Sequence, residues 1–270
     1  MKLALSTLGL PGTDLPRVAD LAAQSGYHGV ELRTHPDEPV HPGLDAAQRK
    51  AVTRTFESAG IKILTLAAYA RVADPADTTD LTELVGLTSD LGARYIRVFP
   101  GGAESDTTAD TTADDTAVRR LAEAAPLAHR NGIRILLETH DSHRTGRAVA
   151  RVLDRVDHDG AGALWDVLHT WLGGEAPAES FTHLSPHLGY TQVKDIASPE
   201  DTTPLALGTG VLPLAPCVTQ LPPDGWLCWE YEKRWYPRAT PLPTLLQAGR
   251  EYLTGLTTTA GRRPGRSPRG

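Results

Sequence analysis

The sequence predicts a single α/β domain, an eight-stranded (β/α)8 barrel of the TIM-barrel class. Its 270 residues fit one such barrel, although two smaller domains would also fit that length. Short apolar segments alternate with longer helical ones about every 30 residues, which is the spacing of successive βα units. Eight such units with right-handed crossovers close into one barrel rather than forming two domains.

The expected strands are short apolar segments that end at Gly, Pro or a polar cluster. The first of them ends at Gly9, and the fourth ends before Pro100. The full set comprises residues 3–8, 27–33, 61–67, 95–99, 133–141, 163–166, 190–194 and 226–230.

The expected helices begin at N-capping residues or stop at glycines. Asp14 begins the first helix and Gly26 follows it, and Gly60 and Gly92 close the second and third. Residues 103–115 are interpreted as an acidic, low-complexity loop. The helices comprise residues 14–25, 45–59, 79–91, 116–130, 145–156, 178–184, 214–221 and 241–256.

Residues 1–259 are expected to form the catalytic barrel domain, and residues 260–270 a disordered basic tail. The tail is rich in Arg, Pro and Gly and has no aromatic residue, so it cannot bury a core. Recruitment of a nucleic acid or a membrane by this tail is the less favoured alternative, because four arginines are a weak signal.

Composition disfavours several classes of partner. The formal net charge of -6 argues against a polyanion such as nucleic acid, and no apolar run is long enough to span a membrane. Residues 1–11 lack the long apolar region and the clear cleavage site of a signal peptide, so we expect a first strand there and a cytoplasmic protein. Cys217 and Cys228 are expected to be free thiols, although they could pair.

Residues 133–143, with the sequence IRILLETHDSH, join a short apolar run to a polar cluster. Glu138 and His140 lie on one face of this expected strand, because side chains alternate along a strand. A carboxylate at the end of a buried strand is costly unless it is paired or binds a metal. Partners of Glu138 should therefore lie at the ends of neighbouring strands.

Polar side chains also occur near the ends of the three strands that follow, namely Asp166, Gln192 and Glu230. In a barrel the carboxyl ends of all strands face one mouth, so these side chains should converge with Glu138. Three carboxylates in one pocket repel one another unless a cation neutralises them. Oxygen ligands favour a hard divalent ion, magnesium or manganese above zinc.

Five segments of the chain resemble motifs of the xylose isomerase-like TIM-barrel family of sugar phosphate isomerases and epimerases, also called AP-endonuclease-2-like barrels. The segments are GYHGVELR (26–33), LLETHD (136–141), LWDVLH (164–169), QVKD (192–195) and WEYE (229–232). Their order and spacing match along nearly the whole chain except the tail.

The resemblance implies a divalent metal held at the ends of strands five to eight, here by Glu138, Asp166, Gln192 and Glu230. Manganese or magnesium is the expected ion, with cobalt or zinc as alternatives. The resemblance also implies that Glu138 and Glu230 act as an acid/base pair. His169 falls where family members place a substrate-binding histidine.

Three further residues at strand ends are expected to contact substrate, namely Lys194, Arg97 and Glu31. His140 is expected in the catalytic set, as a base or as a substrate ligand. The chain departs from the family at Gln192, where many members have His, although some dehydratases of the family have Gln. It also has Gly-Thr-Gly at residues 208–210 in place of the family's Gly-Glu-Gly, which removes one carboxylate.

Each of these polar residues also has a purely structural interpretation. Glu138 could form an ion pair with an arginine, Asp166 could cap the following helix, and Gln192 could bond to backbone. His140 could be a structural histidine, and Lys194 could simply balance the carboxylates.

We therefore expect a metal-dependent isomerase or epimerase that acts on a keto-sugar or sugar derivative. One carboxylate would take a proton from the carbon next to a carbonyl, giving an enediolate. The alternative is a lyase or dehydratase of the same family, which would eliminate a group from a 3-keto-glycoside or from a dehydroshikimate- or inosose-like substrate. Trp165, Trp229 and Trp235 are interpreted as packing or as cavity walls on which a sugar could stack.

Two other classes of function are less favoured by the sequence. A DNA-repair endonuclease would need more histidines and a basic groove, which the sequence does not indicate. A metal-stabilised binding subunit without catalysis is the other alternative. The expected partner is a small sugar or polyol, with neither nucleic acid nor membrane, and a homo-oligomer is left open.

Overall fold

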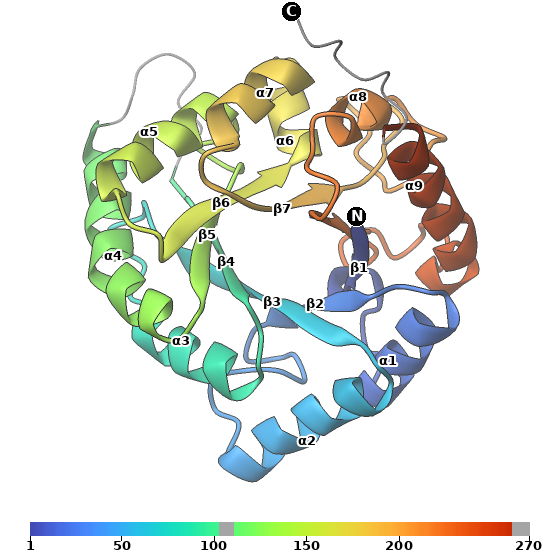
Figure 1. Ribbon diagram of the computed structural model, residues 1–270, viewed down its shortest axis with the longest axis horizontal. Coiled ribbons are helices and arrows are strands. Elements are labelled where there is room, and N and C mark those ends of the chain that lie inside the picture. The colour runs from blue at the N-terminus through green and yellow to red at the C-terminus, as the bar shows by residue number, and fades with distance from the viewer. Residues whose placement is uncertain (103–110, 261–270) are drawn as a thin grey trace, which may run out of the picture.

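The computed structural model describes residues 1–102 and 111–260. Eight parallel strands form a closed barrel in chain order, and β1 completes the circle by pairing with β8. Figure 1 shows the helices as a ring around the strands. The predicted (β/α)8 barrel is therefore confirmed.

The strands are short, as expected of barrel strands. They are Lys2–Ser6 (β1), Gly29–Thr34 (β2), Lys62–Arg71 (β3), Tyr95–Phe99 (β4), Arg134–Glu138 (β5), Ala161–Asp166 (β6), Leu188–Val193 (β7) and Trp226–Trp229 (β8). The last two end one residue before the expected positions, so Lys194 and Glu230 directly follow their strands.

The α-helices lie between the strands and after the last one. They are Leu15–Gln24 (α1), Ala46–Ser58 (α2), Leu81–Asp90 (α3), Thr111–Arg130 (α4), Gly146–Val156 (α5), Val167–Leu172 (α6), Pro177–Leu184 (α7), Leu214–Val218 (α8) and Leu246–Ala260 (α9). Short 3-10 turns occur at Thr7–Gly9 and Leu242–Thr244.

Capping residues fix the starts of the early helices. The Asp14 carboxylate accepts a hydrogen bond from the Arg17 amide at the start of α1. Asp45 and Gln48 form a reciprocal capping box at the start of α2. Both arrangements satisfy amide groups that have no partner inside the helix.

Two of the expected element boundaries are corrected. The loop predicted for residues 103–115 is wrong in its last part, because α4 begins at Thr111; residues 103–110 lie outside the described part of the chain. Acidic residues such as Asp114 suit the first turn of a helix, where they face the positive end of its dipole. Ala260, assigned to the tail, is the last residue of α9, and residues 261–270 lie outside the described part.

The six-residue helix α6, which follows β6 without a loop, was not predicted from the sequence. Asp166 ends the strand and caps this helix by accepting a hydrogen bond from the Leu168 amide at 2.8 Å. So short a helix shows no clear periodicity in sequence, and its formation depends on the cap.

A small apolar cluster fills the inside of the barrel below the strand ends, apart from the large core between strands and helices. It consists of Ala4, Leu64, Tyr95, Leu136, Leu164, Tyr190, Trp226 and Cys228. Four of these residues stand two positions before Glu138, Asp166, Gln192 and Glu230, on the same face of their strands. The strand period therefore places polar side chains in the layer directly above this plug.

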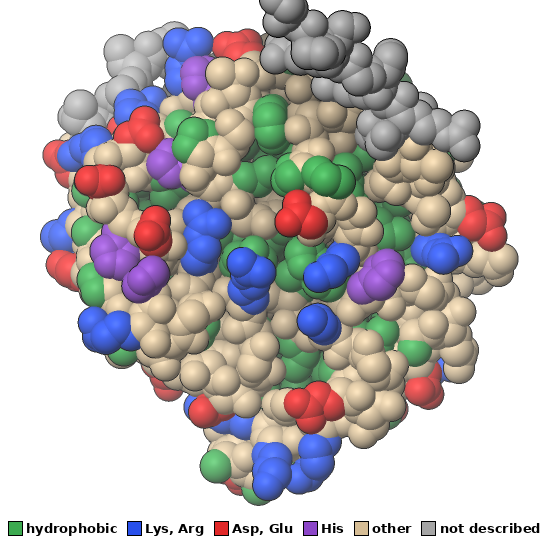
Figure 2. Space-filling view, in the orientation of Figure 1, with side chains coloured by type: hydrophobic (Ala, Val, Ile, Leu, Met, Phe, Trp, Pro, Cys, Tyr) green, Lys and Arg blue, Asp and Glu red, His purple; other side chains and the backbone are tan. Residues whose placement is uncertain are grey.

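The two cysteines are buried free thiols, as expected. Within the described residues, no helix is both long and apolar enough to cross a membrane. On the face shown in Figure 2, acidic and basic side chains are interspersed, with several Lys and Arg near the centre.

Candidate active site

Four side chains proposed as metal ligands come together in the barrel mouth. Glu138 ends β5, Asp166 ends β6, Gln192 lies in β7 and Glu230 follows β8. Asp166 and Gln192 are register partners on neighbouring strands. All four side chains are buried. Oxygens of Glu138, Asp166 and Glu230 lie within 4.8 Å of one another, which is close enough to share one cation.

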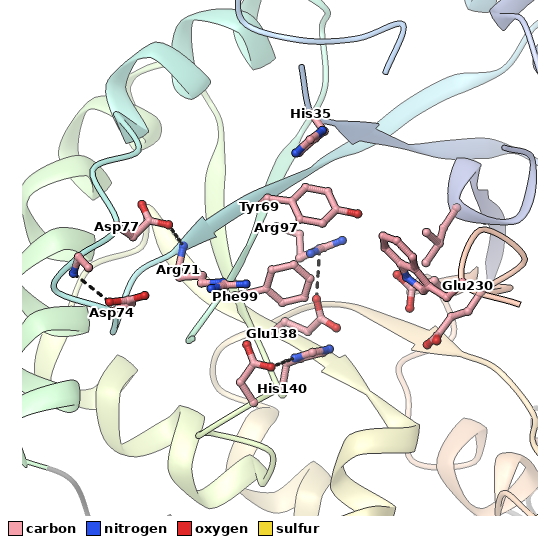
Figure 3. A pocket seen from close by; sticks show the side chains of 15 residues that line it. His35, Tyr69, Arg71, Asp74, Asp77, Arg97, Phe99, Glu138, His140 and Glu230 are labelled. Carbon is pink, nitrogen blue, oxygen red and sulfur yellow. Dashed lines mark hydrogen bonds and ion pairs between the residues drawn. The ribbon is translucent and has the colours of Figure 1, made fainter. Parts of the chain in front are cut away.

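Arg97 and Glu138 form an ion pair at the inner wall of this site, with 3.1 Å between Arg97 Nε and Glu138 Oε2 (Figure 3). Glu138 is therefore an ion-pair partner of an arginine, as the structural interpretation expected, through one of its two oxygens. This ion pair does not neutralise the site, because Asp166 and Glu230 are equally buried.

Gln192 bridges two carboxylates through its amide nitrogen. Its Nε2 donates to Glu31 Oε1 and Oε2 at 3.0 and 2.9 Å and to Glu230 Oε1 at 3.1 Å. Glu31 also accepts a hydrogen bond from the Tyr190 hydroxyl. Glu31, proposed as a substrate contact, thus lies beneath Gln192 as a buried acceptor that orients the amide.

Lys194 lies among three carboxylates. Its Nζ is 2.8 Å from Asp166 Oδ2 and 2.8 Å from Glu232 Oε1, and it also contacts Glu230 Oε2. The side chain is 3% exposed. This geometry agrees with the alternative in which Lys194 balances the negative charge of the carboxylates.

Burial and neighbouring charges set the pKa values of the site in opposite directions. Burial raises the pKa of Glu138 to about 8, against the opposing effect of Arg97. Burial also raises the pKa of Asp166, and the nearby negative charge of Glu230 raises it further. Burial disfavours ionisation of Glu230 as well, but Lys194 and Arg97 outweigh it and hold the pKa below its ordinary value. Such divergence is typical of acid/base sites.

Two histidines pack against each other, with tilted rings, at the side of the carboxylates. The ring centroids of His140 and His169 are 4.0 Å apart, and His169 Nε2 is 3.8 Å from Asp166 Oδ2. Asp141 Oδ1 lies 2.7 Å from His140 Nδ1 and so fixes the orientation of that ring. Asp141 has a left-handed backbone conformation (φ 42°), which is uncommon for residues other than glycine.

The donor atoms of the site fit a divalent metal ion. Among the described residues, Glu138 Oε2, Asp166 Oδ2 and Gln192 Oε1 are buried and accept no hydrogen bond. Arg97 and Lys194 reach the two carboxylate oxygens as ion pairs, without hydrogen-bond geometry. Buried acceptors without hydrogen bonds are costly, and a bound cation would satisfy them. Carboxylate and amide oxygens suit a hard ion.

A cavity of about 590 Å³ opens above these groups. Glu138, His140 and Glu230 line its floor together with Arg97, and Tyr69, Phe99 and Trp235 line its aromatic side. Figure 3 shows Tyr69, Arg97, Phe99 and Glu138 grouped together in this cavity. Its volume is in the range of small-molecule sites.

Asp195 shapes the loop that carries the Gly-Thr-Gly sequence. Its Oδ2 accepts hydrogen bonds from the amides of Gly208 and Gly210, each at 2.9 Å. A Cβ at residue 210 would lie 2.1 Å from the Ile196 carbonyl oxygen, so only glycine fits there. The QVKD segment thus supplies both site residues and a loop anchor.

Sequence reasoning did not single out Tyr190, Glu232, Asp141 or Tyr69. Alternation along the chain could have found two of them, because Tyr190 precedes Gln192 and Glu232 follows Glu230 by two positions. Asp141 adjoins His140, but its hydrogen bond depends on a left-handed turn that no pattern indicates. Tyr69 lies on an extension of β3 beyond the predicted end at residue 67.

The closed barrel and the carboxylates at its mouth define a (β/α)8-barrel protein with a polar site of the kind that holds metal. The chain belongs to the xylose isomerase-like TIM-barrel family, whose model matches residues 19–256. No curated protein sequence matched the chain.

Similar solved structures share the whole fold. The probable 3-DHS dehydratase AsbF from Bacillus anthracis is 19% identical, with a TM-score of 0.77 over 94% of this chain and 99% of that one. The IOLI protein with a bound zinc atom is 17% identical, with a TM-score of 0.79 over 97% and 100%. D-psicose 3-epimerase from Clostridium cellulolyticum H10, solved with D-tagatose, is 16% identical, with a TM-score of 0.79 over 95% and 99%. These likenesses show the fold.

Proposed function

We propose that the protein is a divalent-metal-dependent isomerase or epimerase of a keto-sugar or a related polyol. The observation that carries this proposal is that oxygens of Glu138, Asp166 and Glu230 lie within 4.8 Å of one another in the barrel mouth. Gln192 lies beside them, in register with Asp166 and hydrogen-bonded to Glu230. The solved neighbours include a sugar epimerase and a protein with bound zinc, which supports the same class.

The ion would be held by Glu138, Asp166, Gln192 and Glu230, and manganese or magnesium is the expected metal. When bound there, a divalent cation polarises a carbonyl and so makes the neighbouring C–H bond more acidic.

The residues of the chain would move the proton. Glu230, whose pKa lies below its ordinary value, is ionised and can accept the proton from the carbon next to the carbonyl. Glu138 would return a proton to the neighbouring carbon or the opposite face. Arg97, His169 and Lys194 would orient substrate oxygens, and the apolar plug below the site keeps water from reaching it from underneath.

Elimination is the second candidate, and His140 is the observation that favours it. Asp141 holds the His140 ring, and against the effect of burial, this carboxylate and Glu138 raise the imidazole pKa. A protonated imidazole beside the enediolate could protonate a leaving group one carbon further along. Gln192 points the same way, because some dehydratases of the family have Gln at that position.

Charge at the mouth argues against a nucleic-acid substrate. The acidic side chains that line the cavity outnumber the arginines, Arg71 and Arg97; they are Asp74, Asp77, Glu138, Asp141, Glu230 and Glu232. Phosphate groups would be repelled there. We expect a cytoplasmic enzyme acting on a small molecule, whether as a monomer or as a homo-oligomer.

A panel of keto-sugars incubated with manganese-loaded protein tests this proposal. Equal-mass isomers as products would support isomerisation, and loss of water or of an attached group would support elimination. No turnover of any keto-sugar or keto-polyol by protein with a full complement of metal would overturn both.

A further inference from the structure

We propose that the outer part of the cavity is a stacking subsite for an uncharged planar ring attached to the reacting sugar or polyol, with Trp235 as its platform. This inference rests on the proposed function for the identity of the reacting part. It concerns a different region of the cavity, on the loop after β8, and it can be tested by binding alone.

Trp235 is exposed where a packing residue would be buried. Its side chain is 54% exposed and lines the cavity, whereas Trp165 and Trp229 are fully buried. Among the described residues, Val211 is the other exposed large hydrophobic residue, at 48%, and it does not line this cavity. Exposure of the apolar indole surface to water is unfavourable. A ligand ring that covers this surface would gain free energy of binding by removing it from water.

The indole of Trp235 is held in place by two arginines. The guanidinium carbons of Arg33 and Arg234 lie 5.2 and 5.7 Å from its ring centroid. Glu38 fixes both arginines, at 2.8 Å from Arg33 Nη1 and 3.1 Å from Arg234 Nη1. Asp37 adds a further contact to Arg234 at 2.5 Å. A platform with so little freedom loses little entropy when a ligand stacks on it.

An aromatic band continues from Trp235 into the cavity. Arg33 also lies over Tyr69, 4.9 Å from its ring centroid, so the guanidinium is shared by the two rings. Tyr69 in turn contacts His35 and Phe99 edge to face, with centroid distances of 5.2 and 5.7 Å. Glu138 and Glu230 line the same cavity as this band, so one ligand could reach both.

Charge in the outer cavity selects the class of ring. Arg33 and Arg234 are already paired with Glu38 and Asp37, and so do not offer a free anion site. Glu232 also lines the cavity and is paired with Lys194, so it adds no free charge there either. An uncharged aromatic or unsaturated ring, such as the aryl group of an aryl glycoside, therefore fits this surface best. The cavity, at about 590 Å³, has room for such a group beside a sugar.

Binding of phenyl β-D-glucoside and methyl β-D-glucoside, measured by calorimetry, tests the subsite without any turnover. The wild-type protein should bind the phenyl glycoside about tenfold more tightly, the effect expected of one aromatic stack. Trp235→Ala should bring this ratio close to one, and Trp235→Phe should retain part of it. Val211→Ala, which changes an exposed hydrophobic residue outside the cavity, should leave the ratio unchanged.

The outcomes separate this inference from the proposed function. A ratio near one in the wild type, no measurable binding of the phenyl glycoside, or an unchanged ratio in Trp235→Ala would overturn the subsite. If the wild type is a dimer and Trp235→Ala is a monomer with an unchanged ratio, Trp235 belongs to a subunit contact instead. If no keto-sugar is turned over but the ratio behaves as expected, the subsite stands and the proposed reaction fails. Asp166→Ala should abolish turnover and keep the ratio.

Discussion

The ammonium group of Lys194 lies 2.8 Å from Oδ2 of Asp166, inside the set of side chains that we propose as metal ligands. The Lys194 ammonium group and a bound metal ion would therefore both be attracted to the same carboxylates. Electrostatic repulsion between them should weaken metal binding.

Lys194→Met is expected to bind manganese at least about tenfold more tightly than the wild type, because one buried positive charge is removed. Competition with a chelator of known affinity measures the change. Lys50→Met, at an exposed position of α2, is the control and should leave the affinity unchanged. Weaker binding in Lys194→Met would mean that Lys194 organises the ligands rather than competing with the ion.

Asp166→Ala should abolish metal binding. Manganese should raise the melting temperature of the wild type and leave that of the variant unchanged, because a ligand stabilises only the folded state that binds it. Asp154→Ala is a matched control, since this carboxylate is 69% exposed and pairs with His187 on the surface. Unchanged metal content in Asp166→Ala would remove Asp166 from the site.

Gln192→His should shift metal preference towards zinc or cobalt, because imidazole nitrogen is a softer ligand than an amide oxygen. Titration of one metal against another on the two proteins measures this preference. The same order of preference in both would show that Gln192 Oε1 does not coordinate the metal. Gln192 would then have only a structural role, through the hydrogen bonds that its Nε2 donates to Glu31.

Acid stability should depend on Asp114, which joins α4 to the loop after β5. Its Oδ1 lies 2.9 Å from His143 Nε2, and Arg151 Nε lies 2.5 Å from its Oδ2. Burial opposes ionisation, but Arg151 and His143 outweigh it and lower the pKa of Asp114. A lowered pKa stabilises the fold above the unfolded value of about 4, and this contribution disappears as the pH falls through the folded value.

Asp114→Asn should therefore lower the free energy of unfolding by ~1–3 kcal/mol at pH 7, and by much less at about pH 3. Urea denaturation at the two pH values measures the difference. Asp115→Asn, at a neighbouring carboxylate that is 64% exposed and pairs with Arg155, should have little effect at either pH. An equal loss at both pH values in Asp114→Asn would mean that its charge is not what stabilises the fold.

Much of the fold and of the candidate site could be predicted from sequence, because both follow from the period of the strands. Leu136 and Glu138 face the inside of the barrel for the same reason, and so do Leu164 and Asp166. Once eight such strands close, the strand ends must meet at one mouth. Glycines and capping residues placed most helix boundaries within a few residues.

What could not be predicted depends on contacts between elements. The contact of Lys194 with Asp166 joins β6 to the residue after β7, and no pattern along one strand gives its geometry. The exposure of Trp235 depends on the loop after β8, where Arg33 of β2 and the adjacent Arg234 lie against the indole. Helix α6 is too short to show a period.

The measurement that most directly tests the proposed chemistry is turnover of an accepted keto-sugar by Glu138→Gln and Glu230→Gln, with metal content determined in the same samples. Both carboxylates are proposed to handle the proton, so each variant that still carries metal should lose on the order of 10²–10⁴-fold in kcat/KM. Parallel assays in deuterated water should show deuterium at the carbon next to the carbonyl with the wild type. Full turnover in both metal-loaded variants would contradict proton transfer by Glu138 and Glu230.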